Sequence, residues 1–412
     1  MANDLQNTSL VTKFAMKEFS NSLQLAMKVD RQLDTSRVFN KVGATVNVRR
    51  PLYLAATSGA QITTGQISDL EEGTVPVILD QREKVVYPLS STELTLNIED
   101  TVSRYVKPAM NELAQKVETY LAGLYYAIPN IVGTPGSLPS SFLDVANAGA
   151  KLDELGVPDD GTRCAFYGPK ESVALADSLK GVYPNEIAKS AIERAFIKDY
   201  GNFMIYKNQS LVTHTVGVST GTPLINGNNQ NTTYALAKNT WTQTLNTDGW
   251  TNSQTGILKK GDVFTIADVY AVNRGTRVST QELASFTVMA DADSGASTGP
   301  AVLTISPPII ISGPYATVNA APVDGKGITV KTGTGGSSYR QNLAFHPNSI
   351  TLAMAQLDLP SDGASSAREN YKGISVRVVR QYDIKIDSTI IRFDILFGAK
   401  VQNPEWAVRT TS

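Results

Sequence analysis

One stretch decides the fold, EDTVSRYVKPAMNELAQKVETYLAGLYYAI, which runs from Glu99 to Ile128. Its apolar residues recur every three or four positions, and this spacing places them on one face of a helix. At about 1.5 Å per residue such a helix would run roughly 45 Å, so we expect a spine on which other elements lie. Pro108 predicts a bend, or a short helix followed by a long one, because a proline inside a helix removes a hydrogen bond and costs about 3 kcal/mol. An ordinary amphipathic core helix is the simpler alternative.

The segment before this helix reads as extended chain rather than as a compact core. It is polar and spaced with glycine, and two apolar runs, Val75–Leu79 and Val85–Leu89, flank the charged sequence Asp80–Lys84. This pattern predicts two strands joined by a charged tip. An isolated hairpin is only marginally stable in water, so this excursion is expected to need a partner surface.

Charged residues of the excursion are our candidates for contacts between subunits. Arg49 and Arg50 stand at its base and could pair across an interface with the acidic residues Glu71 and Glu72. The other candidates lie in the charged tip and are Arg82, Glu83 and Lys84. A simple solvated charged face is the alternative to an interface.

The remaining elements are helices and strands in alternation. Thr8–Val29 is predicted to be an amphipathic helix that either docks on its own domain or reaches onto a neighbour. Downstream, helices alternate with strands, which favours an α+β domain. These helices are predicted at Phe142–Leu155, Lys170–Leu179 and Glu186–Lys198. Three closing strands are predicted at Gly373–Gln381, Tyr382–Ile386 and Thr389–Phe397.

Between these parts, Ser219–Ser338 is rich in Thr, Gly, Asn and Ser and has almost no helical periodicity. It reads as short strands separated by turns, which predicts a small all-β barrel inserted into the α+β domain. The predicted domains are the N-terminal arm 1–45, the extended β-hairpin loop 46–98, the spine helix and peripheral domain 99–141, the first part of an axial α+β domain 142–218, the barrel 219–341, and the return of the axial and peripheral domains 342–412.

Composition excludes several classes of function. The chain has 412 residues, with 37 Lys and Arg against 38 Asp and Glu, so it lacks the dense cationic face of a tight nucleic-acid binder. A single cysteine, Cys164, excludes a disulfide framework and a cysteine-cluster zinc site, and we expect it to be buried. His214 and His346 are expected to be structural. The glycine-rich run Lys331–Ser338 lacks the order of a phosphate-binding loop, so we expect no catalytic, cofactor-binding or metal-binding residues.

The N-terminal sequence MANDLQNTSL lacks the basic and apolar regions of a signal peptide, and the chain has no apolar run of about 18 residues. We therefore expect a chain that is cytosolic when made and has no membrane partner.

A specific resemblance rests on Lys260–Asn273, KGDVFTIADVYAVN, with Phe345–Asn348 (FHPN) and Phe397–Lys400 (FGAK) in support. With its order of N-terminal helical arm, extended loop, spine helix, α+β domain and inserted barrel, the chain resembles the major capsid proteins of tailed bacteriophages, the HK-ninety-seven fold. It looks most like the coat proteins of short-tailed phages related to the Salmonella phage P-twenty-two, which carry a barrel insertion.

The resemblance implies a shell protein of the virion. Such proteins assemble as hexamers and pentamers into an icosahedral shell that encloses double-stranded DNA, on a scaffolding protein and with a portal protein at one vertex. Assembly would take place in the host bacterial cytoplasm, and the near-neutral charge fits weak, non-specific contact with the packaged DNA. The extended loop would lie over a neighbouring subunit, and the barrel would sit outside and help the subunit fold.

Two features depart from some members of that family. Lys84 is the single lysine of the extended loop and no partner signal accompanies it, so we predict no covalent mesh between subunits. Between Lys238 and Lys259 the single charged residue is Asp248, which argues against a long charged barrel loop in contact with a neighbouring capsomer.

Two other classes of function stay open on the sequence. One is a different phage structural protein, such as a tail tube, fibre or decoration protein, although the long helix and the mixed segment 142–217 argue against a fibre. The other is an enzyme with a carbohydrate-binding β module. Its aromatic platform would be Trp241, Trp250 and Tyr270, which we expect to pack within the barrel instead.

Overall fold

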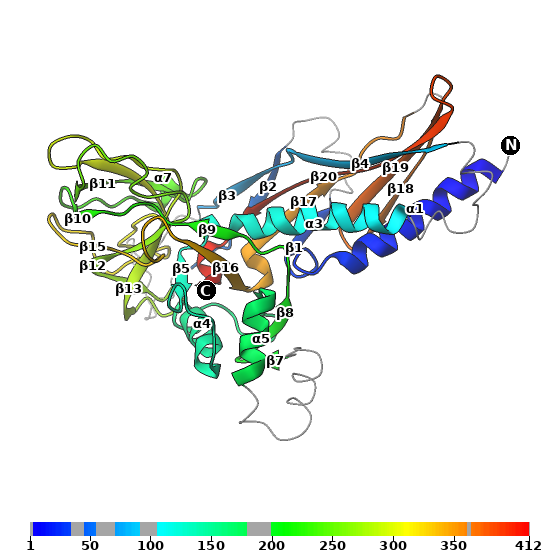
Figure 1. The fold of residues 1–412 in the computed structure, drawn as a ribbon. Helices are drawn as coiled ribbons and strands as arrows, with labels where there is room; N and C mark the ends of the chain where they lie inside the picture. The colour runs from blue at the N-terminus through cyan, green and yellow to red at the C-terminus, as the bar shows by residue number, and fades with distance from the viewer. Residues whose placement is uncertain are drawn as a thin grey trace. The chain divides into compact units, whose positions relative to one another are not determined.

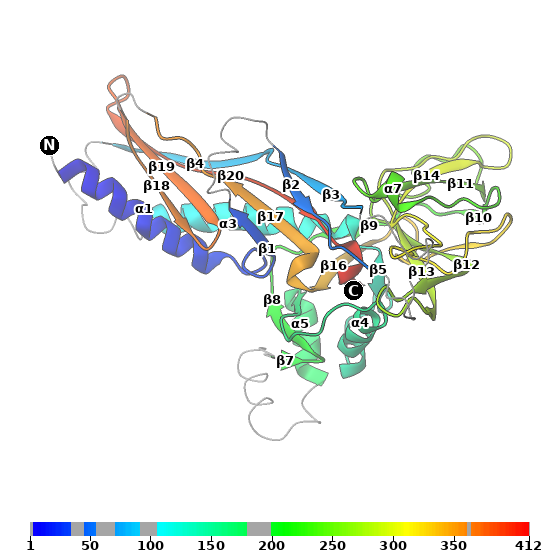
Figure 2. The ribbon, with the colours of Figure 1, turned by 180° about the vertical axis from the view of Figure 1, so that it is seen from behind.

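The computed structural model describes residues 3–33, 45–54, 71–90, 105–178, 199–360 and 364–411. The chain forms two compact units, whose elements are labelled in Figures 1 and 2. The first, which we call the helix–sheet unit, draws on residues 1–47, 76–122 and 350–400. The second, the barrel unit, draws on residues 48–75, 123–349 and 401–412. Each unit is therefore built from segments that are far apart in the sequence.

The spine helix α3 runs from Lys107 to Gly123 and is followed by the 3-10 turn η3 (Leu124–Ala127). The prediction at Pro108, a bend or a short helix before a long one, stays a prediction, because the chain just before Tyr105 lies outside the described residues. Pro108 lies in the first turn of α3, where N–H groups have no partner inside the helix, so proline is tolerated. Positions 99–104 of the predicted helix lie outside the described residues. The predicted apolar face is confirmed by the buried residues Met110, Leu113, Val117 and Leu121.

The N-terminal helix α1 (Asn3–Ser22) docks on its own unit. It contacts strands β18 (Ser365–Tyr371) and β19 (Ile374–Asp383), and its Phe19 is fully buried. The helix ends before the predicted Val29 because the chain turns there onto α3. The turn is held by the Glu118 carboxylate, which accepts hydrogen bonds from the backbone N–H groups of Gln24, Leu25 and Ala26.

The sheet of the helix–sheet unit has the strand order β1, β17, β20, β19, β18, with β4 also paired to β20. β4 runs antiparallel to β20, from Gln81 opposite Phe397 to Ser90 opposite Ser388. The strand predicted at Thr389–Phe397 is confirmed as part of β20, where Phe393 and Phe397 are buried on one face. The strands not yet given are β1 (Asp30–Leu33), β4 (Gln81–Ser90), β17 (Ile350–Ala355) and β20 (Ser388–Val401).

The predicted two-stranded excursion is wrong for the part that the structure describes. β3 (Thr74–Ile78) pairs with β2 (Thr45–Arg49), whereas β4 belongs to the other sheet. Most of the charged run lies inside β4 rather than at a tip. The reason is that side chains alternate between the two faces of the strand throughout the charged run, with Arg82 and Lys84 exposed and Glu83 half-buried. Positions 55–70 and 91–100 of this segment lie outside the described residues.

The end of the chain also differs from the prediction. β19 runs on to Asp383, so Tyr382–Ile386 is not a strand of its own. The chain then turns, and Asp387 has a φ of 44°, a left-handed conformation that aspartate tolerates better than most residues. β20 follows directly from this turn.

The barrel unit contains a seven-stranded sheet with the order β5, β21, β16, β6, β8, β7 and with β9 beside β16. Helices α4 (Phe142–Glu154) and α5 (Pro169–Ser178) confirm two predicted helices and share an apolar core with the strands. The predicted helix 186–198 lies outside the described residues. The strands are β5 (Asn130–Val132), β6 (Cys164–Tyr167), β7 (Asp199–Tyr200), β8 (Phe203–Lys207), β9 (Thr213–Thr215), β16 (Ser338–Phe345) and β21 (Ala407–Thr411).

The predicted barrel is confirmed as an antiparallel sheet that closes on itself, in the order β10, β11, β14, β13, β12, β15. An isolated bridge between Leu224 of β10 and Gly327, the residue before β15, closes the sheet. Its core is apolar, and the fully buried residues include Leu245, Phe264, Phe286 and Leu303. The strands are β10 (Gly221–Ile225), β11 (Gln243–Trp250), β12 (Val263–Val272), β13 (Ser279–Val288), β14 (Ala301–Ser306) and β15 (Ile328–Val330).

Candidate functional site

Three of the charged residues near the extended segment pair within their own chain. Arg49 Nη1 lies 3.7 Å from Glu72 Oε2, and the two side chains are 78% and 55% exposed. Glu71 Oε2 lies 3.7 Å from Lys238 Nζ. Exposed pairs of this kind contribute only about 0–1 kcal/mol to stability. Arg49 and Glu72 therefore stay accessible to a second molecule, whereas the Glu71 side chain is half-buried, with its Oε2 enclosed beside Lys238.

Arg50 differs because its guanidinium is enclosed. Its Nε donates to Lys238 O at 2.9 Å, and its Nη1 donates to Gln402 O at 2.7 Å. The guanidinium also lies 4.8 Å from the centre of the Trp241 ring. Burial lowers the pKa of Arg50 to about 10, against the opposing effect of Glu405. Arg50 thus joins segments of its own chain.

Arg82 and Lys84 lie on the exposed face of β4, beside charged residues of the neighbouring strands. Asp394 of β20 stands opposite Lys84 on one side and opposite Arg377 of β19 on the other. Its carboxylate is contacted by Arg82 Nη2 at 3.4 Å, by Arg392 Nε at 2.6 Å and by Arg377 Nη2. Three arginines and one lysine around a single carboxylate leave a positive surface on this part of the sheet.

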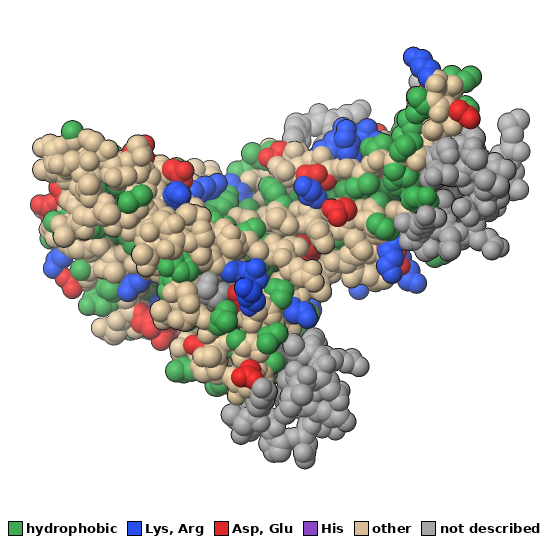
Figure 3. All heavy atoms as spheres, in the orientation of Figure 1, with side chains coloured by type: hydrophobic (Ala, Val, Ile, Leu, Met, Phe, Trp, Pro, Cys, Tyr) green, Lys and Arg blue, Asp and Glu red, His purple; other side chains and the backbone are tan. Residues whose placement is uncertain are grey.

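Asp394 is fully buried beneath these arginines. Burial by itself would raise the pKa of the Asp394 carboxyl, but hydrogen bonds from Arg392 and Arg377 outweigh it, and the net pKa is lowered. The positive surface is local. On the face seen in Figure 3, basic and acidic side chains lie interspersed rather than gathered in one basic field.

A buried polar hub joins the barrel to the seven-stranded sheet. The Asp262 carboxylate, just before β12, is fully buried. Its Oδ1 lies 2.8 Å from His214 Nε2 and accepts from Thr332 Oγ1 at 3.0 Å. Its Oδ2 accepts from the backbone N–H groups of Gly217 and Lys259 at 2.9 and 2.7 Å. One carboxylate therefore ties together segments on both sides of the barrel junction.

Tyr125 and Arg409 extend this hub. Tyr125 Oη lies 3.0 Å from His214 Nδ1. Arg409 is fully buried, lies over the Tyr125 ring and donates from Nη1 to Gly261 O at 2.8 Å. Burial lowers the pKa of Arg409 to about 10, although Tyr125 and Asp262 oppose the shift. Sequence reasoning missed the acidic partner of His214 because the two residues are 48 positions apart.

A second buried cluster centres on Glu405, in the 3-10 turn η6 (Pro404–Trp406). Its Oε1 accepts from Trp241 Nε1 at 3.2 Å and from Arg274 Nη2 at 2.6 Å. Trp250 lies in the barrel core, as predicted. Since Trp241 and Trp250 are only 3% and 2% exposed, they form no platform on which a sugar could stack.

The remaining candidate residues have structural partners. Cys164 is fully buried, as predicted, with its Sγ 3.6 Å from Phe345 O. His346 Nε2 lies 3.2 Å from Asp160 Oδ2, and its ring meets Trp406 edge-on. Among the described residues, no three His, Cys, Asp or Glu side chains are placed to hold a metal ion. No helix in the described ranges is long and apolar enough to span a membrane.

A family model described as P22 coat protein, gene protein 5, matches residues 1–409. This chain belongs to the P22 coat protein family. The coat protein is 24% identical over 421 aligned residues to a major capsid protein of Acyrthosiphon pisum secondary endosymbiont phage 1, and the match covers 98% of both chains.

The coat protein is also similar to two solved phage structures. One is from Mycobacterium phage Che8, at 12% identity and a TM-score of 0.43, covering 95% of this chain and 90% of that chain. The other is the capsid of cyanophage P-SCSP1u, at 11% identity and a TM-score of 0.45, covering 93% of this chain and 86% of that chain.

Membership of this family gives the coat protein its function. It is a phage major capsid protein, a structural protein and not an enzyme. Proteins of this kind assemble in many copies into the icosahedral shell of the virion, and the predicted capsid fold with an inserted barrel is confirmed. The stretch behind the resemblance, Lys260–Asn273, contains Gly261 and Asp262 of the hub together with β12. The recognisable motif is thus the joint between the barrel and the sheet.

Proposed function

We propose that the coat protein forms hexamers and pentamers that close into a shell around double-stranded DNA. Assembly takes place in the host bacterial cytoplasm, on a scaffolding protein and with a portal protein at one vertex. The family match over residues 1–409 carries this proposal. The balance of 37 basic against 38 acidic residues supports a container that touches its DNA weakly and without sequence preference. The six segments defined from the sequence are its proposed domains, with 46–98 taken as an extended segment rather than a hairpin of β3 and β4.

We further propose that charged side chains near the extended segment and on β4 make contacts between subunits. The face of β4 around Arg82 and Lys84 is positive, whereas Glu72 is acidic and accessible and Glu71 is acidic and half-buried. Opposite charges on two copies would guide encounter and register more than they add affinity. Arg50 is left out of this set because its guanidinium is enclosed within its own chain. The proposed contact residues are Arg49, Glu71, Glu72, Arg82, Glu83 and Lys84.

Electron microscopy of the purified chain tests the proposed function, both alone and with the candidate scaffolding protein of the same phage. Closed shells, or uniform rings of five and six subunits, are the expected result. Dispersed monomers in both samples, at every ionic strength tried, would overturn the proposal.

A further inference from the structure

The inserted barrel contacts the two segments that flank residues 55–70. We call these segments, residues 50–54 and 71–74, the loop roots. The roots are joined to each other, because Arg50 N donates to Gly73 O at 2.9 Å. Beyond this bond, most of the polar contacts made by the roots go to residues of the inserted barrel.

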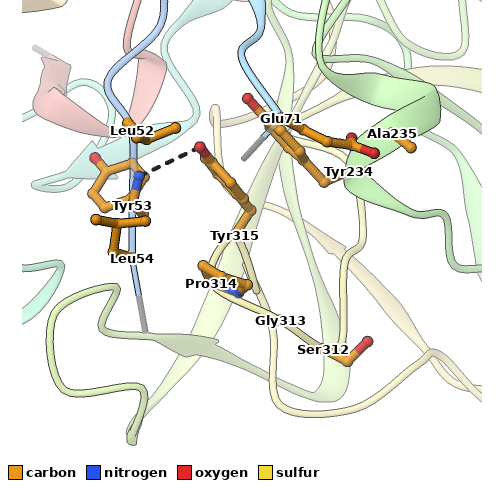
Figure 4. Close-up of a pocket in the computed structure, with 10 residues that line it drawn as sticks. All are labelled: Leu52, Tyr53, Leu54, Glu71, Tyr234, Ala235, Ser312, Gly313, Pro314 and Tyr315. Atoms are coloured by element: carbon orange, nitrogen blue, oxygen red, sulfur yellow. Dashed lines mark hydrogen bonds between the residues drawn. The ribbon is translucent and has the colours of Figure 1, made fainter. Parts of the chain in front are cut away.

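The first root meets the barrel at three points. Tyr53 N donates to Tyr315 Oη at 3.3 Å, a bond drawn as the dashed line in Figure 4. The two rings meet edge-on with their centroids 5.6 Å apart. Arg277 Nη2 donates to Leu54 O at 2.7 Å. Arg274 lies 5.3 Å from the centre of the Tyr53 ring, which adds a cation–π contact. The main chain of this root is therefore held on both sides of Tyr53.

The second root meets the barrel just after the short helix α7 (Tyr234–Ala237). Glu71 pairs with Lys238 at 3.7 Å. Thr74 N donates to Asn239 Oδ1 at 3.2 Å. As in the first root, one of the bonds is made by a backbone N–H group to a barrel side chain.

One turn of the barrel reaches both roots. Lys238 O accepts from Arg50 Nε at 2.9 Å, and a Cβ on Gly73 would come within 2.6 Å of the same oxygen. Tyr234 stacks on Tyr315 with ring centroids 3.6 Å apart, so the barrel groups that hold the two roots support each other. Between the roots lies a cavity of about 270 Å³, lined in part by Leu52, Tyr53, Tyr234 and Tyr315 (Figure 4).

We propose that the barrel is a clamp that fixes the direction of the main chain at both loop roots and so positions Glu71 and Glu72 for contact with a second copy. The clamp acts through Tyr315, Asn239 and Arg277, each of which bonds a backbone group of a root. These bonds hold the path of the chain whatever side chains the roots carry. The inference rests on the proposed function, because only assembly requires the roots to point in a fixed direction.

Hydrogen exchange of the unassembled chain tests the clamp directly. The double variant Tyr315→Phe, Asn239→Ala removes the acceptors of Tyr53 N and Thr74 N but keeps the Tyr315 ring. Peptides that cover the roots should exchange about tenfold faster, and peptides from the barrel core should not change. The matched control is Asn319→Ala, which removes a similar bond within the barrel, donated by Tyr270 N to Asn319 Oδ1. It should leave the roots at the wild-type exchange rate.

Electron microscopy of the same variants then tests what the clamp does. The double variant should form fewer closed shells or shells of irregular size, whereas the Asn319→Ala control should assemble like the wild type. Roots that exchange at the wild-type rate in the double variant would overturn the clamp. Faster exchange in the roots of the double variant, together with shells of normal number and size, would overturn the role of the clamp in assembly. If the wild type forms no shells, the proposed function fails, while the exchange rates still decide whether the clamp exists.

Discussion

His214 Nε2 lies 2.8 Å from Asp262 Oδ1, and the two side chains are only 3% and 0% exposed. The contact joins β9 of the seven-stranded sheet to the turn before β12 of the barrel. Because Asp262 also accepts two backbone N–H groups and the Thr332 hydroxyl, its carboxylate has a partner on every side. A buried carboxylate with partners on both oxygens favours one arrangement of the groups around it, so Asp262 fixes β9 against the turn before β12.

Asp262→Asn should lower the free energy of unfolding by about 3 kcal/mol, because buried donors lose a charged acceptor. Asp268→Asn is the matched control. Asp268 belongs to β12, is 64% exposed and pairs with Lys326 at the surface, so its loss should cost less than about 1 kcal/mol. Urea unfolding followed by tryptophan fluorescence compares the two. Equal losses would contradict the importance of the hub.

Gly261→Ala should destabilise the protein more than Gly256→Ala. Both glycines have positive φ, 102° and 63°. Alanine at Gly256 strains the backbone by about 1 kcal/mol, and alanine at Gly261 strains it more, because 102° lies outside the left-handed region of other residues. At Gly261 a Cβ would also lie 3.1 Å from Tyr125 Cε2, whereas nothing lies within 4 Å at Gly256. Thermal unfolding should therefore give Gly261→Ala the lower melting temperature, and the reverse order would argue against close packing at the hub.

Acid should weaken the helix–sheet unit through Asp394. The pKa of this carboxyl is lower in the folded chain than its ordinary value of about 3.9. Its contribution is therefore present above that value and is lost as the pH falls through the folded pKa. The difference in unfolding free energy between wild type and Asp394→Asn should then narrow below a pH of about 4. A difference that stays constant from neutral to acidic pH would assign the acid sensitivity to other groups.

The double variant Arg82→Ala, Lys84→Ala should slow shell formation and leave stability within about 1 kcal/mol of the wild type, because both side chains are exposed. Light scattering during assembly measures the rate. Added salt should slow the wild type and affect the variant less, since salt screens exposed charges. Lys326→Ala, a lysine on the barrel surface, is the control. Assembly of the double variant at the wild-type rate would remove Arg82 and Lys84 from the set of contact residues.

Cys164 should resist thiol reagents in the native protein and react on unfolding. Its side chain is fully buried beside Phe345, and a thiol must be exposed and ionised to react. Labelling in increasing urea should follow the unfolding curve of the barrel unit. Rapid labelling without denaturant would show that β6 opens locally.

Elements defined by their own periodicity could be predicted from the sequence. The buried face of α3 and the helix α4 both follow from the spacing of apolar residues, because that spacing reports directly which side chains share a face. Strand β20 was predictable for the same reason. The position of Pro108 was not, because spacing does not say in which turn a helix begins.

Partners that lie far along the chain could not be predicted. Alternation in β4 shows that the strand has a neighbour, but not that the neighbour is β20, where Arg82 meets Asp394 across 312 positions. Arg49 and Arg50 are identical neighbours in the sequence, yet one is exposed and the other is enclosed against Trp241. Only the fold distinguishes them. The sequence therefore indicates the candidate contact residues as a group, and the structure shows which of them are exposed.

The pairing of β4 with β20 has a consequence for synthesis on the ribosome. At about 5–20 residues per second, Ser388 is added roughly 15–60 s after Ser90, and until then β4 has an open edge. The strands β10 to β15 are contiguous in the chain, so the barrel can close while the helix–sheet unit still waits for its central strand. A nascent or prematurely terminated chain thus carries a folded barrel on an incompletely folded subunit. A subunit becomes competent to join a shell only after β20 has been synthesised.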